Sequence, residues 1–256
     1  MRDAWRLAVG TFTALRVNPP SRVDEQVAGR AMLLAPATAL PVLLVWVVLG
    51  AMAVAGVVPA AVAAVLTLIA VALVSRALHL DGLADTADGL TSGHDPERSL
   101  EVMRRGDTGP AGAASLVFVL LLQTVCLAAL FNSASGVALA SVALLTSRVA
   151  PAVASRRGVP PARPGGLGAA VAETVSPVAV AAVATGLLVA GTLVVLTVGG
   201  TAYAAGLVVV VGAAGAWLVV RHTVRRLGGI TGDVIGAAIE VSLAAALVAA
   251  SVAHGL

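Results

Sequence analysis

The chain passes without a charge through Ala60-Ala-Val-Ala-Ala-Val-Leu-Thr-Leu-Ile-Ala-Val-Ala-Leu-Val74 and soon afterwards meets three aspartates in His79-Leu-Asp-Gly-Leu-Ala-Asp-Thr-Ala-Asp-Gly89. Apolar runs of about 20 residues are long enough to cross the hydrocarbon core of a bilayer as a helix. On a helix, offsets of four and seven residues bring Asp81, Asp85 and Asp88 within roughly 60° of one another. The sequence therefore predicts three carboxylates on one helix face, directly after a membrane-length segment.

Three carboxylates on one face repel one another unless a cation lies among them. Beside a segment with almost no other charge, this pattern is typical of a divalent-metal site at the bilayer surface, and we expect the ion to be Mg²⁺. The alternative is that Asp81 caps a helix while Asp85 and Asp88 point into water. The crowding of the three side chains favours the metal site.

The composition is that of a polytopic membrane protein. Hydrophobic residues make up 59% of the chain and charged residues 11%, with a mean hydropathy of +1.00, far outside the range of soluble domains. We expect an all-α helical bundle with about seven transmembrane helices, forming a single transmembrane domain over residues 1–256. The apolar runs are 33–55, 57–78, 110–131, 134–154, 177–198, 201–220 and 234–253.

The distribution of arginine predicts the orientation of these helices. The chain has no lysine, and its arginines gather before the first run, between the second and third, after the fourth and after the sixth, whereas the connections near 56, 132 and 199 have none. The positive-inside rule makes the arginine-bearing side cytoplasmic. The net charge of +3 then needs no nucleic acid to explain it. Arg76 and Arg148 fall near the cytoplasmic ends of their runs, where we expect them to snorkel to the interface.

The remaining segments are less informative. Residues 1–30 have scattered charges and do not resemble a signal peptide; Trp5, Val9 and Phe12 recur at helical spacing and predict a short interfacial helix in a cytoplasmic arm. Cys126 lies inside an apolar run, where we expect a packing role. The prolines and glycines of Val159–Gly168 predict a loop without a helix.

Two further polar clusters fall on the predicted cytoplasmic side. Arg104 and Asp107 precede the run that begins near 110, and Thr231 and Asp233 precede the last run, where either is also explained as a plain N-cap. Glu240 lies two turns inside that last run, and a carboxylate in a span marks a functional site or a buried partner. Because Glu240 is seven residues beyond Asp233, both face the same way, and we expect a second acidic or substrate-orienting wall.

Carboxylates, arginines and glycine turns at a membrane surface suit one kind of chemistry. Mg²⁺ is held by one or two carboxylates plus substrate phosphates, and arginines neutralise the remaining phosphate charge. We therefore expect transfer of a phosphoryl-linked group. A zinc site is disfavoured because His79, His94, His222 and His254 are dispersed, and His79 is better explained as a hydrogen-bonding neighbour of the carboxylates.

The motifs together resemble those of the cobalamin synthase family, also called adenosylcobinamide-GDP ribazoletransferases. The resemblance is carried by His79–Gly89, by Leu100-Glu-Val-Met-Arg104 with Gly109 and Gly112, and by Thr231-Gly-Asp-Val-Ile-Gly-Ala-Ala-Ile-Glu240. It covers nearly the whole chain, with the aspartate segment the most specific part and the middle third the weakest. The chain reads Met-Arg-Arg-Gly-Asp at 103–107 where many members read Met-Arg-Asp-Ser-Arg, so the substrate contact within this segment stays open.

The resemblance implies an enzyme of the bacterial cytoplasmic (inner) membrane with its active site on the cytoplasmic side. Its substrates would be adenosylcobinamide-GDP and α-ribazole, or the 5′-phosphate of α-ribazole. A ribose hydroxyl would attack the phosphorus nearest cobinamide, GMP would leave, and the product would be adenosylcobalamin or its 5′-phosphate. Membrane lipid is the other expected partner, and a homo-oligomer stays open.

The resemblance also implies roles for particular residues. Asp81, Asp85 and Asp88 would hold Mg²⁺ on the pyrophosphate, with Asp88 by analogy taking the proton of the attacking hydroxyl. The other residues that we expect on the substrate side are His79, Arg104, Asp107, Arg163, Thr231, Asp233 and Glu240. Among them the arginines would contact phosphate, while Asp233 and Glu240 would orient the ribose or the base.

Three other functions remain alternatives. An intramembrane prenyltransferase also binds Mg²⁺-diphosphate on aspartate-rich helices, but it usually has two such motifs with an asparagine. A CDP-alcohol phosphotransferase usually has Ala-Arg after its first Asp-Gly pair, where this chain has Ala84-Asp85. A small-molecule transporter would use Asp85 or Glu240 as a coupling carboxylate, but transporters place their sites near the bilayer midplane.

Overall fold

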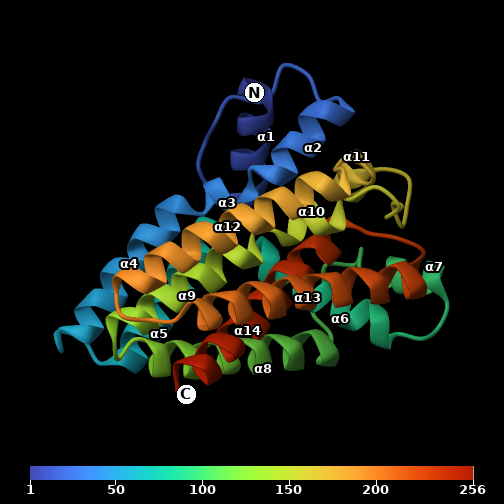
Figure 1. Cartoon of the computed structure of the whole chain (residues 1–256). Helices are drawn as coiled ribbons and strands as arrows, with labels where there is room; N and C mark the ends of the chain where they lie inside the picture. Colours follow the sequence, from blue (N-terminus) through green and yellow to red (C-terminus); the bar gives the residue numbers. More distant parts are fainter. Residues whose placement is uncertain (256) are drawn as a thin grey trace.

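The computed structural model describes residues 1–255, and this part of the chain is α-helical with two isolated β-bridges and no strand (Figure 1). The helices are α1 (Arg2–Phe12), α2 (Glu25–Leu33), α3 (Ala35–Thr38), α4 (Leu40–Val54), α5 (Ala60–Val74), α6 (Leu78–Thr91), α7 (Pro96–Val102), α8 (Pro110–Leu130), α9 (Ala134–Ser147), α10 (Ala150–Ala154), α11 (Gly166–Val171), α12 (Pro177–Thr197), α13 (Ala202–Leu227) and α14 (Gly232–His254). The predicted all-α membrane bundle is confirmed.

Five helices of the described chain are long and apolar enough to cross a membrane. They are α8, the continuous segment Ala134–Ala154 that joins α9 to α10, α12, α13 and α14. A helix of 21 residues is roughly 32 Å long, which matches the hydrocarbon core. A sixth span exists if α5 and α6 count as one broken helix, so the expected number of about seven was approximate.

Two of the seven predicted spans are not single long helices, because the helix is interrupted at positions that the apolar pattern does not reveal. The run 33–55 is divided between α2, α3 and α4, and α4 begins with Pro41 in its first turn, leaving only 15 residues. The run 57–78 ends at Arg76 and Ala77, which both have positive φ (55° and 56°), and α6 leaves this corner at 88° to α5. Left-handed residues cannot continue an α-helix, so the chain changes direction here.

The bundle has two distinct ends, with α14 packed among α6, α8, α9 and α13 (Figure 1). At one end Ser133, before α9, hydrogen-bonds His254 of the C-terminal helix at 3.0 Å. At the other end Arg226 of α13 donates to the carbonyl oxygens of Leu90 and Gly93, after α6. The predicted arginine-bearing connections thus lie together at one end, and the connections without arginine lie together at the other.

The amino-terminal arm packs on the corner between α5 and α6. The amide of Ala14 donates to the Val74 carbonyl at 2.5 Å, and the Arg76 guanidinium donates to the Gly10 carbonyl at 3.0 Å. Val9 and Phe12 are buried while Trp5 stays 43% exposed, so α1 is an amphipathic helix with one face against the protein. Hydrogen bonds from Ser21 lower the pKa of Asp3 and fasten the loop after α1.

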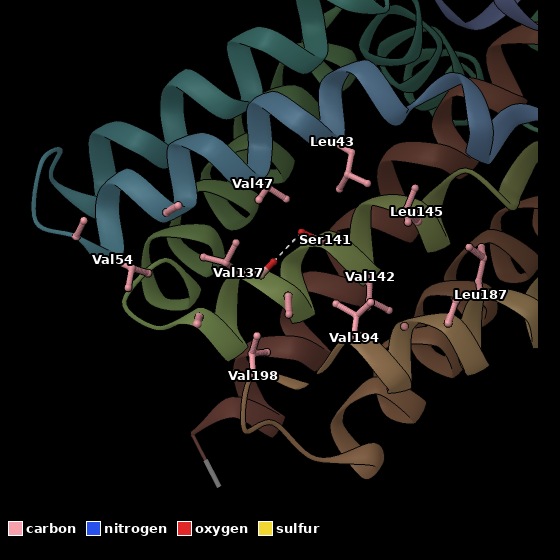
Figure 2. A pocket seen from close by; sticks show the side chains of 16 residues that line it. Leu43, Val47, Val54, Val137, Ser141, Val142, Leu145, Leu187, Val194 and Val198 are labelled. Carbon is pink, nitrogen blue, oxygen red and sulfur yellow. Dashed lines mark hydrogen bonds between the residues drawn. The ribbon is translucent and has the colours of Figure 1, made fainter. Parts of the chain in front are cut away.

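A cavity of about 550 Å³ lies between α4, α9 and α12 (Figure 2). Its wall is formed by side chains such as Leu43, Val137 and Val194, and no charged residue lines it. Its hydroxyl, that of Ser141, already donates to the Val137 carbonyl at 2.8 Å. This cavity offers nothing to a phosphate or a metal, so the chemistry must be sought at the arginine-bearing end.

The separation of the two ends predicts opposite membrane exposure for Asp95 and Ala134, which are both exposed. We expect single cysteines at these positions, in a Cys126→Ala background, to react differently with an impermeant maleimide on intact cells. Position 134 should be labelled from outside, and position 95 only after the membrane is opened. Labelling of 95 but not 134 from outside would contradict the orientation given by the arginines.

Candidate active site

The three aspartates of α6 lie at the arginine-bearing end, close to carboxylates from other segments. Asp81 is exposed, whereas Asp85 and Asp88 keep 9% and 8% of their surface accessible. The negative charges of Asp81, Asp88, Asp107 and Asp233 all act on Asp85. We call Asp81, Asp85 and Asp233 the acidic face, because α6 and the start of α14 bring their carboxylates together. Within residues 1–255 no arginine or histidine lies within 4 Å of the Asp81 or Asp85 carboxylate.

Asp88 has a different environment from its two neighbours on α6. One of its oxygens accepts from the Gly109 amide at 2.7 Å and the other from the Gly112 amide at 2.8 Å. These amides belong to the first turn of α8, whose N–H groups have no partner within the helix. Asp88 therefore caps α8 from another helix, with both carboxylate oxygens engaged. The Asp81 and Asp85 carboxylates, by contrast, have no hydrogen-bond or ion-pair partner among the described residues.

Two glycines allow α6 and α14 to cross closely. A Cβ on Gly82 would lie 2.5 Å from the Asp233 carbonyl oxygen, and a Cβ on Gly236 would lie 3.1 Å from the Cα of His79. Any side chain at either glycine would push the helices apart, since real Cβ atoms are not found at the first of these distances. The close crossing is what places Asp233 beside the aspartates of α6.

Asp233 is held by its own helix cap and by the loop that precedes α11. Thr231 accepts from the Val234 amide at 3.3 Å as the N-cap of α14, and its hydroxyl donates to Asp233 Oδ2 at 3.1 Å. Arg163 Nη2 lies 3.8 Å from the same oxygen, and Arg163 Nη1 is buried without a hydrogen-bond partner among the described residues. Arg163 therefore keeps donor capacity for an anion at the acidic face.

The loop that carries Arg163 differs from its predicted form. Its backbone is paired with the start of α14, because the Ala162 amide donates to the Ile230 carbonyl at 2.9 Å and the Ile230 amide donates to the Pro160 carbonyl at 3.0 Å. The prediction of a loop without a helix over 159–168 was wrong at its end, since α11 begins at Gly166. A helix can start there because the preceding turn, with positive φ at Gly165 and Gly166, frees the chain to reverse.

The segment after α7 contributes a shallow pocket of about 340 Å³ beside Asp88. Arg105 and Asp107 line it together with Gly109, whereas Arg104 is exposed and donates its Nε to the Leu100 carbonyl at 3.3 Å. The sequence predicted Arg104 and Asp107 on the substrate side, and the structure brings Asp107 and Arg105 to this pocket. The only signal for Arg105 was its place between Arg104 and Gly106, which did not distinguish the two arginines.

His79 and Glu240 lie in the buried interior, away from the acidic face. The Glu240 side chain accepts from Gln123 Nε2 at 3.0 Å, and Glu240 Oε1 is 3.9 Å from His79 Nδ1. Arg148, expected to snorkel to the interface, is only 4% exposed and has its Nη1 3.1 Å from His79 Nδ1. That expectation was wrong because the arginine finds polar partners on other helices. The predicted second wall is thus divided, with Asp233 at the acidic face and Glu240 beneath it.

Comparison with known proteins now decides the family. The family model described as cobalamin-5-phosphate synthase matches residues 4–251. The chain belongs to this family. Among its relatives, the adenosylcobinamide-GDP ribazoletransferase of Nocardioides sp. (strain ATCC BAA-499 / JS614) is 50% identical over 250 residues, covering 97% of this chain and 98% of that protein. The protein of the same name from Frankia casuarinae is 41% identical, covering 94% and 92%. No solved structure matches.

The donor set at the acidic face fits a metal shared with a substrate and not a metal held by protein alone. Within residues 1–255 no group of three or more histidine, cysteine, aspartate or glutamate side chains is arranged to hold an ion. Mg²⁺ does not require such a cage, because it commonly takes one or two carboxylates together with substrate phosphates and water. Asp81 and Asp85, one helical turn apart, offer two such carboxylates.

The cap formed by Asp88 predicts that Gly112→Ala will be damaging. The new Cβ would overlap the Asp88 carboxylate and the Ala84 carbonyl, so α8 must move away from α6. We expect a loss of about 1–3 kcal/mol in the free energy of unfolding, measured by thermal unfolding in detergent, together with reduced activity. Gly186→Ala is the matched control, because a Cβ there meets nothing within 4 Å. Equal stability of the two variants would show that the cap does not hold α8.

Proposed function

We propose that this protein transfers the cobinamide-phosphate group of adenosylcobinamide-GDP to α-ribazole, or to its 5′-phosphate, in a Mg²⁺-dependent reaction that releases GMP. The observation that carries the proposal is the acidic face itself, where Asp81 and Asp85 have no ion-pair partner and Asp233 has Arg163 beside it, in a chain of the cobalamin-5-phosphate synthase family. Carboxylates for a metal and guanidinium groups for phosphate are what a diphosphate substrate requires. The relatives that match over most of the chain are named for the same reaction.

The residues would have different roles in metal binding, phosphate binding and proton transfer. Asp81 and Asp85 would hold the metal on the diphosphate, and a bound Mg²⁺ would supply neutralisation of the charge that develops on the leaving GMP. Arg163, beside Asp233, and Arg105, in the pocket beside Asp88, would contact the remaining phosphate oxygens. The new bond joins a ribose oxygen of α-ribazole to the phosphorus nearest cobinamide, and the broken bond is the phosphoanhydride to GMP. The proton of the hydroxyl passes to a carboxylate of the acidic face.

Asp88 receives a different role from the one that its sequence suggests. Its two oxygens accept hydrogen bonds from Gly109 and Gly112, and protonation of the carboxyl would weaken this cap of α8. We assign it to positioning, because it fixes the α8 end of the pocket that contains Arg105 and Asp107.

We also propose that the chain lies in the cytoplasmic membrane with the acidic face on the cytoplasmic side. The arginines that surround the face support this side through the positive-inside rule. The position at one end of the bundle also disfavours a transporter, whose site would lie near the bilayer midplane.

Removal of either unpaired carboxylate, Asp81 or Asp85, should stop the reaction without unfolding the protein. We expect Asp81→Asn and Asp85→Asn to lower activity by about 100-fold or more, because asparagine keeps the size but loses the charge that holds the metal. Asp95→Asn is the matched control. Asp95 caps α7 by accepting from the Glu97 amide at 3.1 Å, and asparagine caps equally well. Comparable losses in Asp95→Asn and Asp85→Asn would contradict a site at the acidic face.

The leaving group separates this function from its alternatives. Purified protein with Mg²⁺, adenosylcobinamide-GDP and α-ribazole should release GMP in step with formation of the closed corrinoid. EDTA should stop both, because a phosphoanhydride loses a dianionic nucleotide slowly when its charge is not neutralised. Release of CMP from a CDP-alcohol, or of pyrophosphate from a prenyl diphosphate, by a folded preparation that yields no GMP would overturn the proposed substrates.

A further inference from the structure

A charged cluster in the interior of the bundle has no part in the chemistry described so far. It consists of Arg148, His79, Glu240 and Gln123, whose exposed fractions range from 1% to 5%. The four side chains come from the junction of α9 and α10 and from α6, α14 and α8, so the cluster links the two helices of the acidic face to α8 and α9. Ionised groups within a membrane-spanning bundle are costly and are retained where they serve a function.

His79 is the member that connects this cluster to the acidic face. Its Nδ1 lies 3.1 Å from Arg148 Nη1 and 3.9 Å from Glu240 Oε1. Because a guanidinium can only donate, Nδ1 is the acceptor and the proton of the neutral ring is on Nε2. The ring is packed on its other side by Phe12, with 6.4 Å between ring centroids. His79 is thus held by α1 and by the arginine after α9, while the charge of Glu240 acts on Arg148.

The start of α6 needs such support because the chain enters it through a strained corner. Arg76 and Ala77 are both left-handed without being glycine, and conformations of this kind persist only where the surroundings enforce them. The other end of α6 is fixed by the bonds from Asp88 to α8. Asp81 follows His79 by two residues and Asp85 follows it by six, so rotation of α6 about its axis would turn both carboxylates away from Asp233 and Arg163.

We propose that Arg148 and Glu240 are positioning residues. Arg148 holds the His79 ring through its hydrogen bond, Glu240 provides the counter-charge for Arg148, and the pair so sets the rotation of α6 that aims Asp81 and Asp85 at the metal-diphosphate. The inference rests on the proposed function of the acidic face. Supporting residues that orient metal ligands commonly change metal affinity or activity by about 10- to 100-fold when they are replaced. Both residues are buried, Arg148 4% and Glu240 3% exposed, and neither belongs to the acidic face.

The test separates positioning from a role in folding alone. Arg148→Met and Glu240→Gln each leave one buried charge without its counterpart and should lower stability. The double variant is neutral and should unfold at about the temperature of the unsubstituted protein. We nevertheless expect it to lose about 10-fold or more in kcat, with an unchanged KM for α-ribazole, and to bind Mn²⁺ about 10-fold more weakly when adenosylcobinamide-GDP is present, measured by electron paramagnetic resonance. Arg148→Lys keeps the positive charge, and we expect its kcat and its Mn²⁺ affinity to fall less than those of the double variant.

Thr146→Val is the matched control, since Thr146 is buried on the same helix and its hydroxyl has no partner within residues 1–255; it should keep kcat and Mn²⁺ affinity. A folded double variant with undiminished kcat and Mn²⁺ affinity would overturn the positioning role. If the unsubstituted protein binds no Mn²⁺ with the substrate present, the metal site of the proposed function fails. In that case kcat of the double variant still decides the inference, because a loss at constant KM supports positioning and an undiminished kcat contradicts it.

Discussion

The acidic end of this protein depends on how closely α6 approaches α8 and α14. Asp88 reaches the first turn of α8 and accepts from two amides that α8 itself cannot satisfy, while Gly82 and Gly236 let the backbones of α6 and α14 meet without intervening side chains. In a bilayer, packing and buried hydrogen bonds must replace the hydrophobic effect as the force between helices. These contacts therefore both stabilise the bundle and bring carboxylates of α6 and α14 together.

The carboxylates at this end of the bundle repel one another, and neighbouring groups reduce that repulsion for some of them. Asp88 is neutralised in effect by the amides of a helix N-terminus, where negative charge is favourable. Asp233 has Thr231 and Arg163. Asp81 and Asp85 have no such partner among the described residues, and this inequality marks them as the pair that a cation would complete. Beneath them, Arg148 and Glu240 carry opposite charges into the interior, where each makes the other tolerable.

The sequence was sufficient for features that depend on local periodicity and composition. The shared face of the three aspartates follows from helical spacing, and the grouping of the arginine-bearing connections at one end of the bundle follows from the order of the apolar runs. The features that the sequence did not predict depend on contacts between residues far apart in the chain. Asp88 is hydrogen-bonded to residues 21 and 24 positions away, and this capping contact with α8 could not be predicted from spacing within α6. Arg148 was expected at the interface because the sequence does not reveal its partners. These are His79 and Glu240, which lie on other helices. The corner at Arg76 and Ala77 gave no signal, since neither residue type favours positive φ.

The central claim is that the metal-diphosphate lies between α6 and the start of α14. Its most direct test is iron-mediated cleavage, in which Fe²⁺ replaces Mg²⁺ and, with ascorbate and peroxide, cuts the backbone nearest the bound ion. With adenosylcobinamide-GDP present, cuts should map to the segments around Asp81–Asp85 and Thr231–Asp233, and Asp85→Asn should abolish both. Cuts elsewhere in the bundle, or the same cuts in Asp85→Asn, would contradict the account.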